Sequence, residues 1–208
     1  GNDAPRLASI DADGHVTPFP ADSEQSFVEP AAVTADNDGN IWILDQGAAP
    51  QTPPSLTEID GHTEKLVRRW VLPAETRSTD SRFSALVVHG NDAYLADEGH
   101  AALAMLDLRD GKGKRFIEDD LSVKGREPMV IDGKAVVDGQ GRPVARDVAM
   151  LALTHDGKWL FYQPPCGPLY RLSTELLTDP SYDIGAQVEG IVKWRGTPTL
   201  GGITMGAN

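Results

Sequence analysis

The chain has 208 residues, of which 40% are hydrophobic, and carries a net charge of −12 at pH 7. This hydrophobic content excludes a disordered chain, and the length suffices for one substantial core. A surface that binds nucleic acid needs clustered Lys and Arg side chains, which the negative net charge argues against. No apolar run approaches the ~20 residues of a membrane span. We therefore expect neither a nucleic-acid partner nor a membrane partner.

Near the N-terminus, a β-hairpin is predicted over Arg6–Pro20, RLASIDADGHVTPFP. Apolar residues on both sides of an Asp-Gly turn are typical of two short antiparallel strands. No second pair of strands directly precedes it in the sequence. We therefore expect this hairpin to join strands that come from elsewhere.

The stretch from Pro30 to Gly47, PAAVTADNDGNIWILDQG, predicts two strands around a tight turn and stops at polar residues. A proline-rich loop follows, which cannot be a central strand. Residues 56–60 and 66–72 then predict an outer hairpin that turns at Gly61. The basic group Lys65–Arg69 lies in this hairpin, where we expect solvated side chains rather than a binding patch.

The same order of strand, polar turn, aromatic strand and polar stop returns at Ser84–Gly99. An outer pair of strands follows at 102–108 and 114–117, with a hairpin turn at Asp110-Gly111. The basic group Lys112–Arg115 is again expected to be solvated.

An insertion occupies residues 118–146 and contains a predicted hairpin at 129–137. Insertions between repeated units of this kind lie on the face where crossovers run, so we expect the hairpin to overhang the opening of a central channel as a lid.

The third copy of the pattern is Met150–Pro165, MLALTHDGKWLFYQPP. A strand at 169–172, a short helix at 173–177 that Ser173 caps, and a strand at 188–194 are predicted after it. No other convincing helix is found. The start of a fourth copy is expected at 199–208, with Ile203 in the place of Val33 and Leu151.

Asp45, Asp97 and Gln163 hold the same place in the three copies, 52 and 66 positions apart. Repeats of this size built from short strands predict a propeller. We therefore expect an all-β chain, a single β-propeller domain or fragment over 1–208, with four-stranded antiparallel blades. Their inner pairs lie near 30–47, 84–99 and 150–165. Strands from the two termini often share one blade of a propeller, so the N-terminal hairpin is expected to complete the last blade.

In a blade, the innermost strand lines the channel and the next strand returns beside it. Residues before the first strand and after the second therefore share one end of the channel, which we expect to be the functional face. This end collects Glu29, Asp45, Gln46, Arg82, Ser84, Asp97, Glu98, His100, Arg146, Asp147, Gln163 and Cys166. The opposite end receives only ordinary hairpin turns.

Asp45, Asp97 and Glu98 suit either a hard cation such as Ca²⁺ or acid/base work on a lactone or sugar-like substrate. Asp residues at strand ends equally often cap the backbone of the following turn, and that alternative stays open. Arg82, Arg146 and Asp147 suit an anionic or polar ligand, with a structural ion pair as the alternative.

The remaining chemistry-bearing residues give weak signals. The five histidines have no metal-ligand spacing, and Cys166 has no obvious base nearby, so a nucleophilic role is not expected. The single cysteine forms no internal disulfide and does not settle the compartment. Trp42, Tyr94 and Trp159 are expected to pack between blades.

Three segments in order, IWILDQG (41–47), AYLADEG (93–99) and LALTHDGKWLFYQPPCGPLYRLSTELL (151–177), resemble the yellow / major royal jelly protein family, specifically its bacterial members. The resemblance implies a six-bladed β-propeller, related in architecture to the gluconolactonase and regucalcin propellers. It also implies a secreted or periplasmic location, although a cytoplasmic one stays open. Family members include binders of small aromatic amines, and many have no established activity.

Two departures from the family pattern matter. An Asp-Gly is common before the inner strand of the third segment, where this chain has Ala149-Met150, and before the fourth, where it has Gly201-Gly202. An acid at the channel mouth is therefore missing or displaced. Six blades do not fit into 208 residues, so we expect about three to four blades here. Further C-terminal blades, or else a partner chain, would close the ring.

Three functions are compatible with these features. The first is a small-molecule-binding propeller with a site at the channel mouth, partly covered by the 129–137 hairpin and lined by Asp45, Arg82, Asp97, Glu98, Asp147 and Gln163. The second is a lactone hydrolase in which Ca²⁺, held by Asp45 and Asp97, polarises the carbonyl. The third is a structural or protein-interaction propeller.

Overall fold

Three four-stranded antiparallel sheets dominate the computed structural model, which describes residues 5–21, 27–48 and 51–206. In each sheet the strands lie side by side in chain order. The first consists of β3 (Pro30–Ala35), β4 (Asn40–Asp45), β5 (Ser55–Asp60) and β6 (Leu66–Val71). The second consists of β7 (Phe83–His89), β8 (Asp92–Asp97), β9 (Ala102–Asp107) and β10 (Gly113–Phe116). The third consists of β13 (Met150–Leu153), β14 (Trp159–Gln163), β15 (Leu169–Ser173) and β16 (Val192–Arg195).

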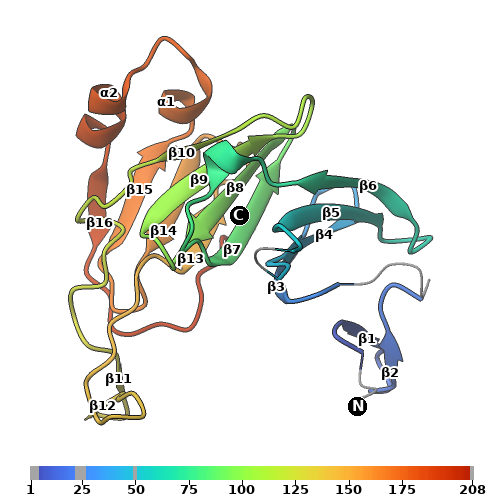
Figure 1. Cartoon of the computed structure of the whole chain (residues 1–208), viewed down its shortest axis with the longest axis horizontal. Coiled ribbons are helices and arrows are strands. Elements are labelled where there is room, and N and C mark those ends of the chain that lie inside the picture. The colour runs from blue at the N-terminus through green and yellow to red at the C-terminus, as the bar shows by residue number, and fades with distance from the viewer. Residues whose placement is uncertain (1–4, 22–26, 49–50, 207–208) are drawn as a thin grey trace.

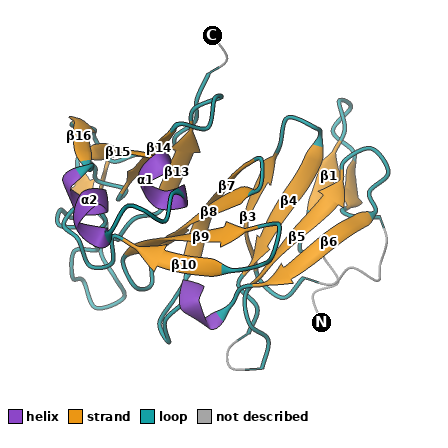
Figure 2. Ribbon diagram, turned by 90° about the horizontal axis from the view of Figure 1, so that it is seen from above, coloured by secondary structure: helices purple, strands orange, loops and turns teal. Residues whose placement is uncertain are grey.

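The sheets follow one another along the molecule in sequence order, with the second between the first and the third (Figures 1 and 2). The first strand of each sheet lies innermost, because β7 contacts both β3 and β13. Four-stranded meanders that contact one another through their first strands are the blades of a β-propeller. The predicted all-β propeller fold is therefore confirmed.

The turn between β3 and β4 shows how the sequence makes these hairpins. Asp36 Oδ1 accepts hydrogen bonds from the backbone N–H groups of Asp38 and Asn40, each at 2.9 Å. Gly39 adopts a φ of +87°, which side chains with a Cβ rarely tolerate. Asp36 Oδ2 accepts the indole N–H of Trp42 at 2.8 Å, so the same carboxylate also fixes a core side chain.

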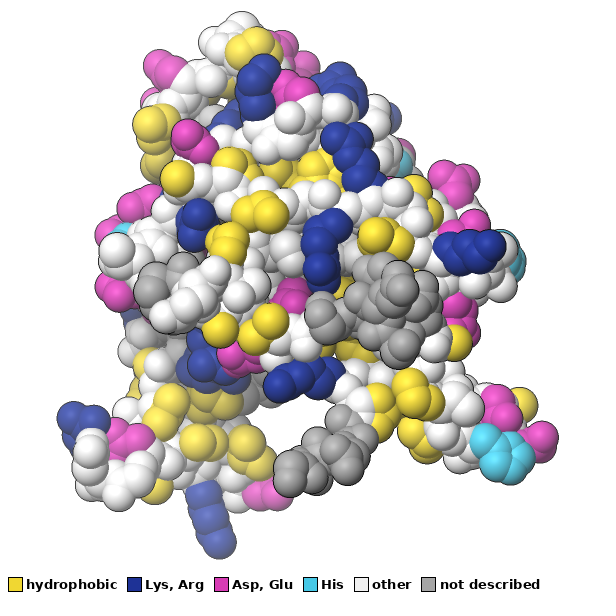
Figure 3. All heavy atoms as spheres, turned by 45° about the vertical axis from the view of Figure 1, so that its right-hand side comes forward, with side chains coloured by type: hydrophobic (Ala, Val, Ile, Leu, Met, Phe, Trp, Pro, Cys, Tyr) yellow, Lys and Arg dark blue, Asp and Glu magenta, His cyan; other side chains and the backbone are white. Residues whose placement is uncertain are grey.

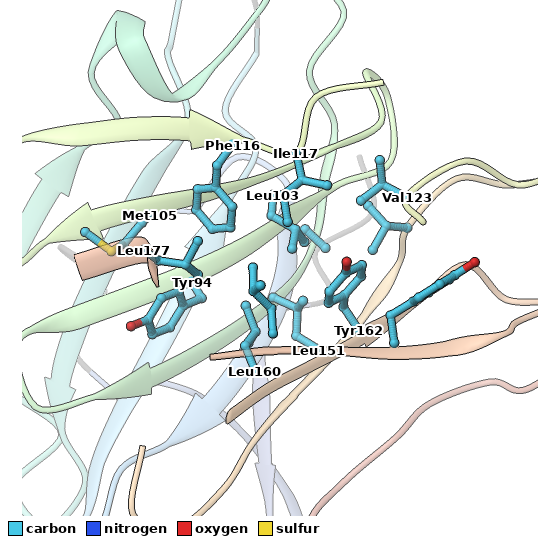
Figure 4. Close-up of a cluster of buried hydrophobic side chains, with 14 of the residues drawn as sticks. Tyr94, Leu103, Met105, Phe116, Ile117, Val123, Leu151, Leu160, Tyr162 and Leu177 are labelled. Carbon is cyan, nitrogen blue, oxygen red and sulfur yellow. The ribbon is translucent and has the colours of Figure 1, made fainter. Parts of the chain in front are cut away.

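The core consists of layers between neighbouring sheets. Because successive strand residues point to opposite faces, Leu95 of β8 packs toward the first sheet with Trp42 and Trp70, while Tyr94 packs toward the third. Figure 4 shows this second layer, in which Tyr94, Leu103 and Phe116 meet residues of the third sheet such as Leu151 and Tyr162.

The prediction that Trp42 and Tyr94 pack between blades is confirmed, since both are buried. Trp159 lies on the face of the third sheet that is turned away from the second, because its neighbour Leu160 packs toward the second sheet. It is partly buried there, and the guanidinium of Arg171 lies 4.2 Å from the centre of its ring. None of the described sheets packs on this face, so packing of Trp159 between blades stays a prediction.

The N-terminal hairpin forms as β1 (Ala8–Ile10) and β2 (Val16–Pro18), a separate two-stranded sheet. Leu7 and Phe19 beside it pack on Phe27, Ile43 and Ile59, on the face of the first sheet that is turned away from the second. The hairpin therefore occupies the side on which a preceding blade would lie.

The segments between and after the sheets differ in detail from the sequence prediction. A short 3₁₀ helix, Ala74–Thr76, precedes the second sheet. The short helix predicted at 173–177 is α1 (Glu175–Thr178), and Ser173 does not cap it because Thr174 is the residue before its first turn. A second helix, α2 (Ile184–Glu189), was not predicted. It occupies the start of the strand expected at 188–194, so β16 begins only at Val192.

The predicted hairpin of the insertion forms as β11 (Val130–Ile131) and β12 (Lys134–Ala135). This hairpin lies beyond one end of the third sheet and projects away from the sheets (Figure 1). Residues 203–206 form no strand, although Ile203 lines the same groove as Val33 and Leu151. Among the described residues, no helix has the length and apolar character to span a membrane.

The surface carries mixed charge. On the face that Figure 3 shows, Lys and Arg side chains are interspersed with acidic and hydrophobic ones rather than gathered in one block. The basic group Lys65–Arg69, which lies largely on the outer strand β6, has exposed side chains, as predicted.

Candidate functional site

The start of each inner strand lies opposite the end of the next strand. Pro30 pairs with Asp45, Phe83 with Asp97, and Met150 with Gln163. The residues before the inner strands and after the second strands therefore lie at one common end of the sheets, as the sequence predicted.

Asp45 is buried at this end, with 3% of the residue exposed. Its carboxylate accepts hydrogen bonds from the backbone N–H groups of Val28 and Glu29, each at 2.8 Å, and of Gly47 at 3.0 Å. Both oxygens are thus engaged by the chain that enters and leaves the blade. Asp45 acts as a backbone cap, which is the alternative that the sequence left open.

Asp97 is fully buried and plays the same part in the second sheet. It accepts backbone N–H groups from Arg82 at 2.8 Å and from Gly99 at 3.1 Å. In addition, the guanidinium of Arg115 lies 2.7 Å from its Oδ2.

The prediction that Arg115 is a solvated basic residue is wrong, because its side chain is only 10% exposed. We expected a solvated side chain because of its charge alone. The loss of water around the guanidinium is compensated, because it donates to the Asp97 carboxylate and to the carbonyl oxygens of Thr76 and His100.

Asp45 and Asp97 do not fit a calcium site. Calcium needs six to eight oxygen ligands, whereas these oxygens already accept N–H groups, and a guanidinium beside Asp97 opposes a second cation. The oxygens of Asp45 and Asp97 also belong to different sheets and are held by separate stretches of backbone.

Gln163 and Asp147 complete the end of the third sheet. Gln163 is fully buried; its Oε1 accepts the hydroxyl of Thr197 at 3.2 Å, and its Nε2 has no partner among the described residues. Asp147 accepts the backbone N–H of Gly125 at 2.8 Å and so ties the insertion to the start of the third sheet. Neither residue lines the pocket between the first and second sheets.

A pocket of about 280 Å³ opens at the common end, between the first and second sheets. Of the six predicted site residues, Arg82 and Glu98 line it. Asp45 and Asp97 do not line it, but their carboxylates bind the backbone of the lining residues Glu29 and Arg82. Its walls are Glu29, Pro30, Ala31, Gln46, Arg82, Phe83, Ser84, Glu98 and Arg146.

Two arginines meet one glutamate in this pocket. Glu98, whose side chain is 10% exposed, is in contact with Arg146 and lies 3.4 Å from Arg82 Nε. Glu29 stands further from Arg82, at 3.9 Å, and is 59% exposed. The side chain of Arg82 is 66% exposed and that of Arg146 is 45% exposed, so both remain partly accessible to solvent.

Gln46 and Ser84 differ in how their polar atoms are used. The side-chain amide of Gln46 donates to the carbonyl oxygen of Phe83 and accepts its N–H, which joins the first sheet to the second. Ser84 is the additional residue of a β-bulge in β7, since Phe83 pairs with Asp97 but Ala85 pairs with Ala96. Its hydroxyl oxygen is buried and has no hydrogen-bond partner among the described residues.

The predicted lid does not cover this pocket. No residue of the hairpin 129–137 belongs to the pocket lining; instead, the backbone N–H of Val130 donates to the hydroxyl of Thr199 at 3.2 Å. Only Arg146, at the end of the insertion, reaches the pocket. The sequence placed the insertion on the correct face but could not give the direction of its hairpin.

A second hollow runs along the inner strands. This groove of about 340 Å³ is lined by β3, β7 and β13 together with Ile203, Thr204 and Met205, and it reaches His89 and His155 at the hairpin-turn end. The sequence predicted only ordinary turns there. The groove follows the innermost strands, where the channel of a closed propeller would lie, and most of its lining residues are apolar or small.

Two clusters outside the pocket place a histidine beside two acids. One consists of Asp11, Asp13 and His15 in the N-terminal hairpin turn, and the other of His100, Glu118 and Asp119. Neither histidine shows metal-ligand spacing in the sequence. Several of these acids are already engaged: Asp11 caps its own turn, Glu118 binds Arg115, and Asp119 binds Lys124.

The model of the family described as "Major royal jelly protein" matches residues 29–197. Among solved structures, virginiamycin B lyase from Staphylococcus aureus is similar at 16% identity and a TM-score of 0.45 over 90% of this chain and 47% of the lyase. A protein from Lactobacillus plantarum is similar at 17% identity and a TM-score of 0.44, over 80% of this chain and 46% of that one. The chain thus spans about half the length of these structures. No curated protein matched the sequence.

Proposed function

This chain belongs to the major royal jelly protein family, and we propose that it binds a small molecule at the mouth of the propeller channel. The ligand would occupy the pocket between the first and second sheets, against Arg82, Ser84, Glu98 and Arg146. The proposal concerns binding alone and assigns no reaction.

The proposal rests mainly on one observation: polar groups whose hydrogen-bonding capacity is not fully used lie together in one pocket. Ligand sites typically combine a preformed hollow with a few precisely placed polar groups. Here the hydroxyl of Ser84 has no partner among the described residues, and two guanidinium groups share one buried carboxylate. The turns at the opposite end engage their acids internally, as Asp36 does.

The buried acids support this pocket from behind. Asp45 fixes the backbone of Glu29, and Asp97 fixes the backbone of Arg82, so each carboxylate positions a residue of the pocket wall. Asp147 holds the chain next to Arg146. These acids belong to the site as positioning residues rather than as contacts to a ligand.

The proposal favours binding over lactone hydrolysis. In a metal-assisted hydrolase several oxygen ligands must converge on the cation. The two acids that the sequence offered for this purpose cap backbone N–H groups in separate sheets. A hydrolase therefore draws no support from Asp45 or Asp97.

A fragment screen observed by two-dimensional ¹⁵N NMR tests the proposal on the 208-residue chain. Hits are expected to shift the amide signals of residues 29, 46, 82–84, 98 and 146. Ala31 is exposed and lines the pocket, so Ala31→Trp should block these hits, whereas Ala8→Trp, on the exposed edge of β1, should leave them unchanged. Hits that map only to the groove along β3, β7 and β13, or no hits at all, would overturn the proposal.

A further inference from the structure

We propose that the channel-mouth pocket selects ligands that carry a carboxylate, and that Ser84, Arg82 and Arg146 together recognise it. This inference rests on the proposed function, because it names the chemical class of ligand for the same pocket. It follows from three features: the excess of N–H donors in the pocket, the hydroxyl of Ser84 that has no partner among the described residues, and the bulge that places it.

The pocket is lined by two acids and two arginines, so its formal charge is balanced, but its hydrogen-bond donors are in excess. Glu98 is the only acid in close contact with both arginines among the described residues, since Glu29 lies 3.9 Å from Arg82 and is mostly exposed. Each guanidinium has five N–H donors, and one carboxylate satisfies only part of the two sets. A planar carboxylate matches the fork of a guanidinium with two parallel hydrogen bonds.

A cationic ligand fits poorly at Glu98 for the same reason. To reach Glu98, an ammonium group would have to displace Arg82 or Arg146 from a carboxylate that is 10% exposed. The chain as a whole carries a net charge of −12, whereas the pocket, with two arginines and two glutamates, is formally neutral. A neutral pocket opposes an approaching anion less than an acidic surface does.

The hydroxyl of Ser84 supplies the third donor. Its oxygen is buried, Ser84 lines the pocket, and the hydroxyl has no hydrogen-bond partner among the described residues. Buried polar atoms without partners are uncommon in folded proteins, and each one calls for an explanation. Because this oxygen is buried, it reaches a ligand only after the Ser84 side chain rotates toward the pocket; one carboxylate oxygen of the ligand would then accept its O–H while the second oxygen faces the arginines.

The β-bulge explains why the hydroxyl lies there. The same irregularity occurs in two of the three inner strands, between Pro30 and Ala32 in β3 and between Phe83 and Ala85 in β7. The additional residue is Ala31 in the first sheet and Ser84 in the second, and both line the pocket. Bulges redirect a side chain next to functional sites, and of these two only the second carries a polar side-chain atom.

Three probes of nearly the same shape test the inference: benzoate, neutral benzamide and cationic benzamidine. Their affinities are measured by ¹⁵N NMR titration of the 208-residue chain. Benzoate is expected to shift the signals of residues 82, 84 and 146 and to bind at least about 10-fold more tightly than benzamide, as charge-assisted hydrogen bonds require.

Variants of the chain separate the contributions. The double variant Arg82→Gln/Arg146→Gln should lose the preference for benzoate while retaining benzamide binding, which reports that the pocket survives. Ser84→Ala should weaken benzoate about 3- to 10-fold. Arg109→Gln and Ser9→Ala, both outside the pocket, are the matched controls and should change nothing.

The outcomes distinguish this inference from the proposed function. If benzamide or benzamidine binds at residues 82–84 as tightly as benzoate, or if other fragments bind there and benzoate does not, carboxylate selection is overturned and small-molecule binding at the mouth stands. If neither these probes nor any fragment of the screen shifts the mouth residues, both fall. A benzoate preference that persists in the double arginine variant also overturns the inference.

Discussion

The Arg115 guanidinium lies 2.7 Å from the carboxylate of Asp97, and both side chains are withdrawn from solvent. Arg115 comes from the outermost strand of the second sheet, whereas Asp97 ends the second strand, beside the channel mouth. Through Asp97, which accepts the backbone N–H of Arg82, this ion pair connects the periphery of the blade to the wall of the pocket.

Removing Arg115 should destabilise the chain strongly. Arg115→Met leaves the Asp97 carboxylate buried without its counter-charge, and losing one partner of a buried pair costs about 3–5 kcal/mol. Urea unfolding followed by circular dichroism measures the change. Arg109→Met is the control, because Arg109 pairs with Asp107 at the surface and should change stability little. A loss below about 1 kcal/mol for Arg115→Met would contradict a structural role for this pair.

The caps made by Asp45 should also be essential to stability. Asp45→Ala leaves the backbone N–H groups of Val28, Glu29 and Gly47 without their acceptor, and each buried unsatisfied group costs about 1–3 kcal/mol. We expect a total loss of at least about 2 kcal/mol in urea unfolding. Asp13→Ala, an exposed acid of the N-terminal turn, serves as comparison. Equal stability of Asp45→Ala and the wild type would show that the caps are dispensable.

Calcium is expected not to raise the melting temperature. A ligand that binds only the folded state stabilises it in proportion to the logarithm of its concentration. Because the oxygens of Asp45 and Asp97 are engaged by N–H groups and Arg115, millimolar calcium should leave the thermal transition unchanged. Differential scanning calorimetry with calcium and with magnesium makes the comparison. A calcium-specific rise that grows with concentration would restore the metal-dependent hypothesis.

Asp36 should make stability depend on acid pH. Burial raises the pKa of Asp36, but hydrogen bonds from Trp42 and from Asn40 together outweigh it and hold the pKa below its ordinary value of 3.8. A carboxyl whose pKa is lowered on folding contributes stability above its unfolded pKa and loses it as pH falls through the folded pKa. The advantage of the wild type over Asp36→Asn should therefore be complete above pH 3.8 and shrink below it.

Urea midpoints of both proteins, measured over a series of pH values across this window, check the prediction. The difference between the two proteins isolates Asp36 from the other acids that titrate in the same range. A difference that stays constant down to the lowest pH would show that the Asp36 carboxylate is not held in its charged form by Trp42 and Asn40.

Gln46 should hold the first two sheets together. Its amide makes two hydrogen bonds to the backbone of Phe83, so Gln46→Leu leaves a buried N–H and C=O without that partner. We expect a loss of about 1–3 kcal/mol, measured by urea unfolding. Gln140→Leu, at an exposed position of the insertion, should have little effect. Similar small changes for both variants would argue against this inter-sheet contact.

The repeated pattern of strand, Asp-rich turn and aromatic strand was sufficient to predict the blades, because hairpin formation depends on local turn chemistry. Asp36 and Gly39 are close in sequence to every backbone group that they organise. The common end of the sheets followed from the same pattern, since antiparallel pairing brings the start of one strand to the end of the next. Asp45, Asp97 and Gln163 were therefore placed correctly at that end.

The role of each polar residue at that end could not be predicted from sequence. Whether a carboxylate caps the backbone, binds a cation or faces a ligand depends on which donors reach it from distant positions. Arg115 lies 18 residues from Asp97, in a predicted outer strand whose charge suggested solvated side chains. Similarly, the direction of the 129–137 hairpin depends on contacts such as Val130 with Thr199, 69 residues away.

The sequence by itself determined the all-β propeller fold and the end of the sheets where polar residues gather, because these depend on periodicity and on local turn chemistry, and the resemblance of three segments to known proteins indicated the family. Only the tertiary structure decided that Asp45 and Asp97 are caps, that Arg115 is buried, and that Ser84 carries an unused hydroxyl beside two arginines. Those assignments depend on which side chains from different sheets come within hydrogen-bonding distance, and on which polar atoms remain without a partner after packing.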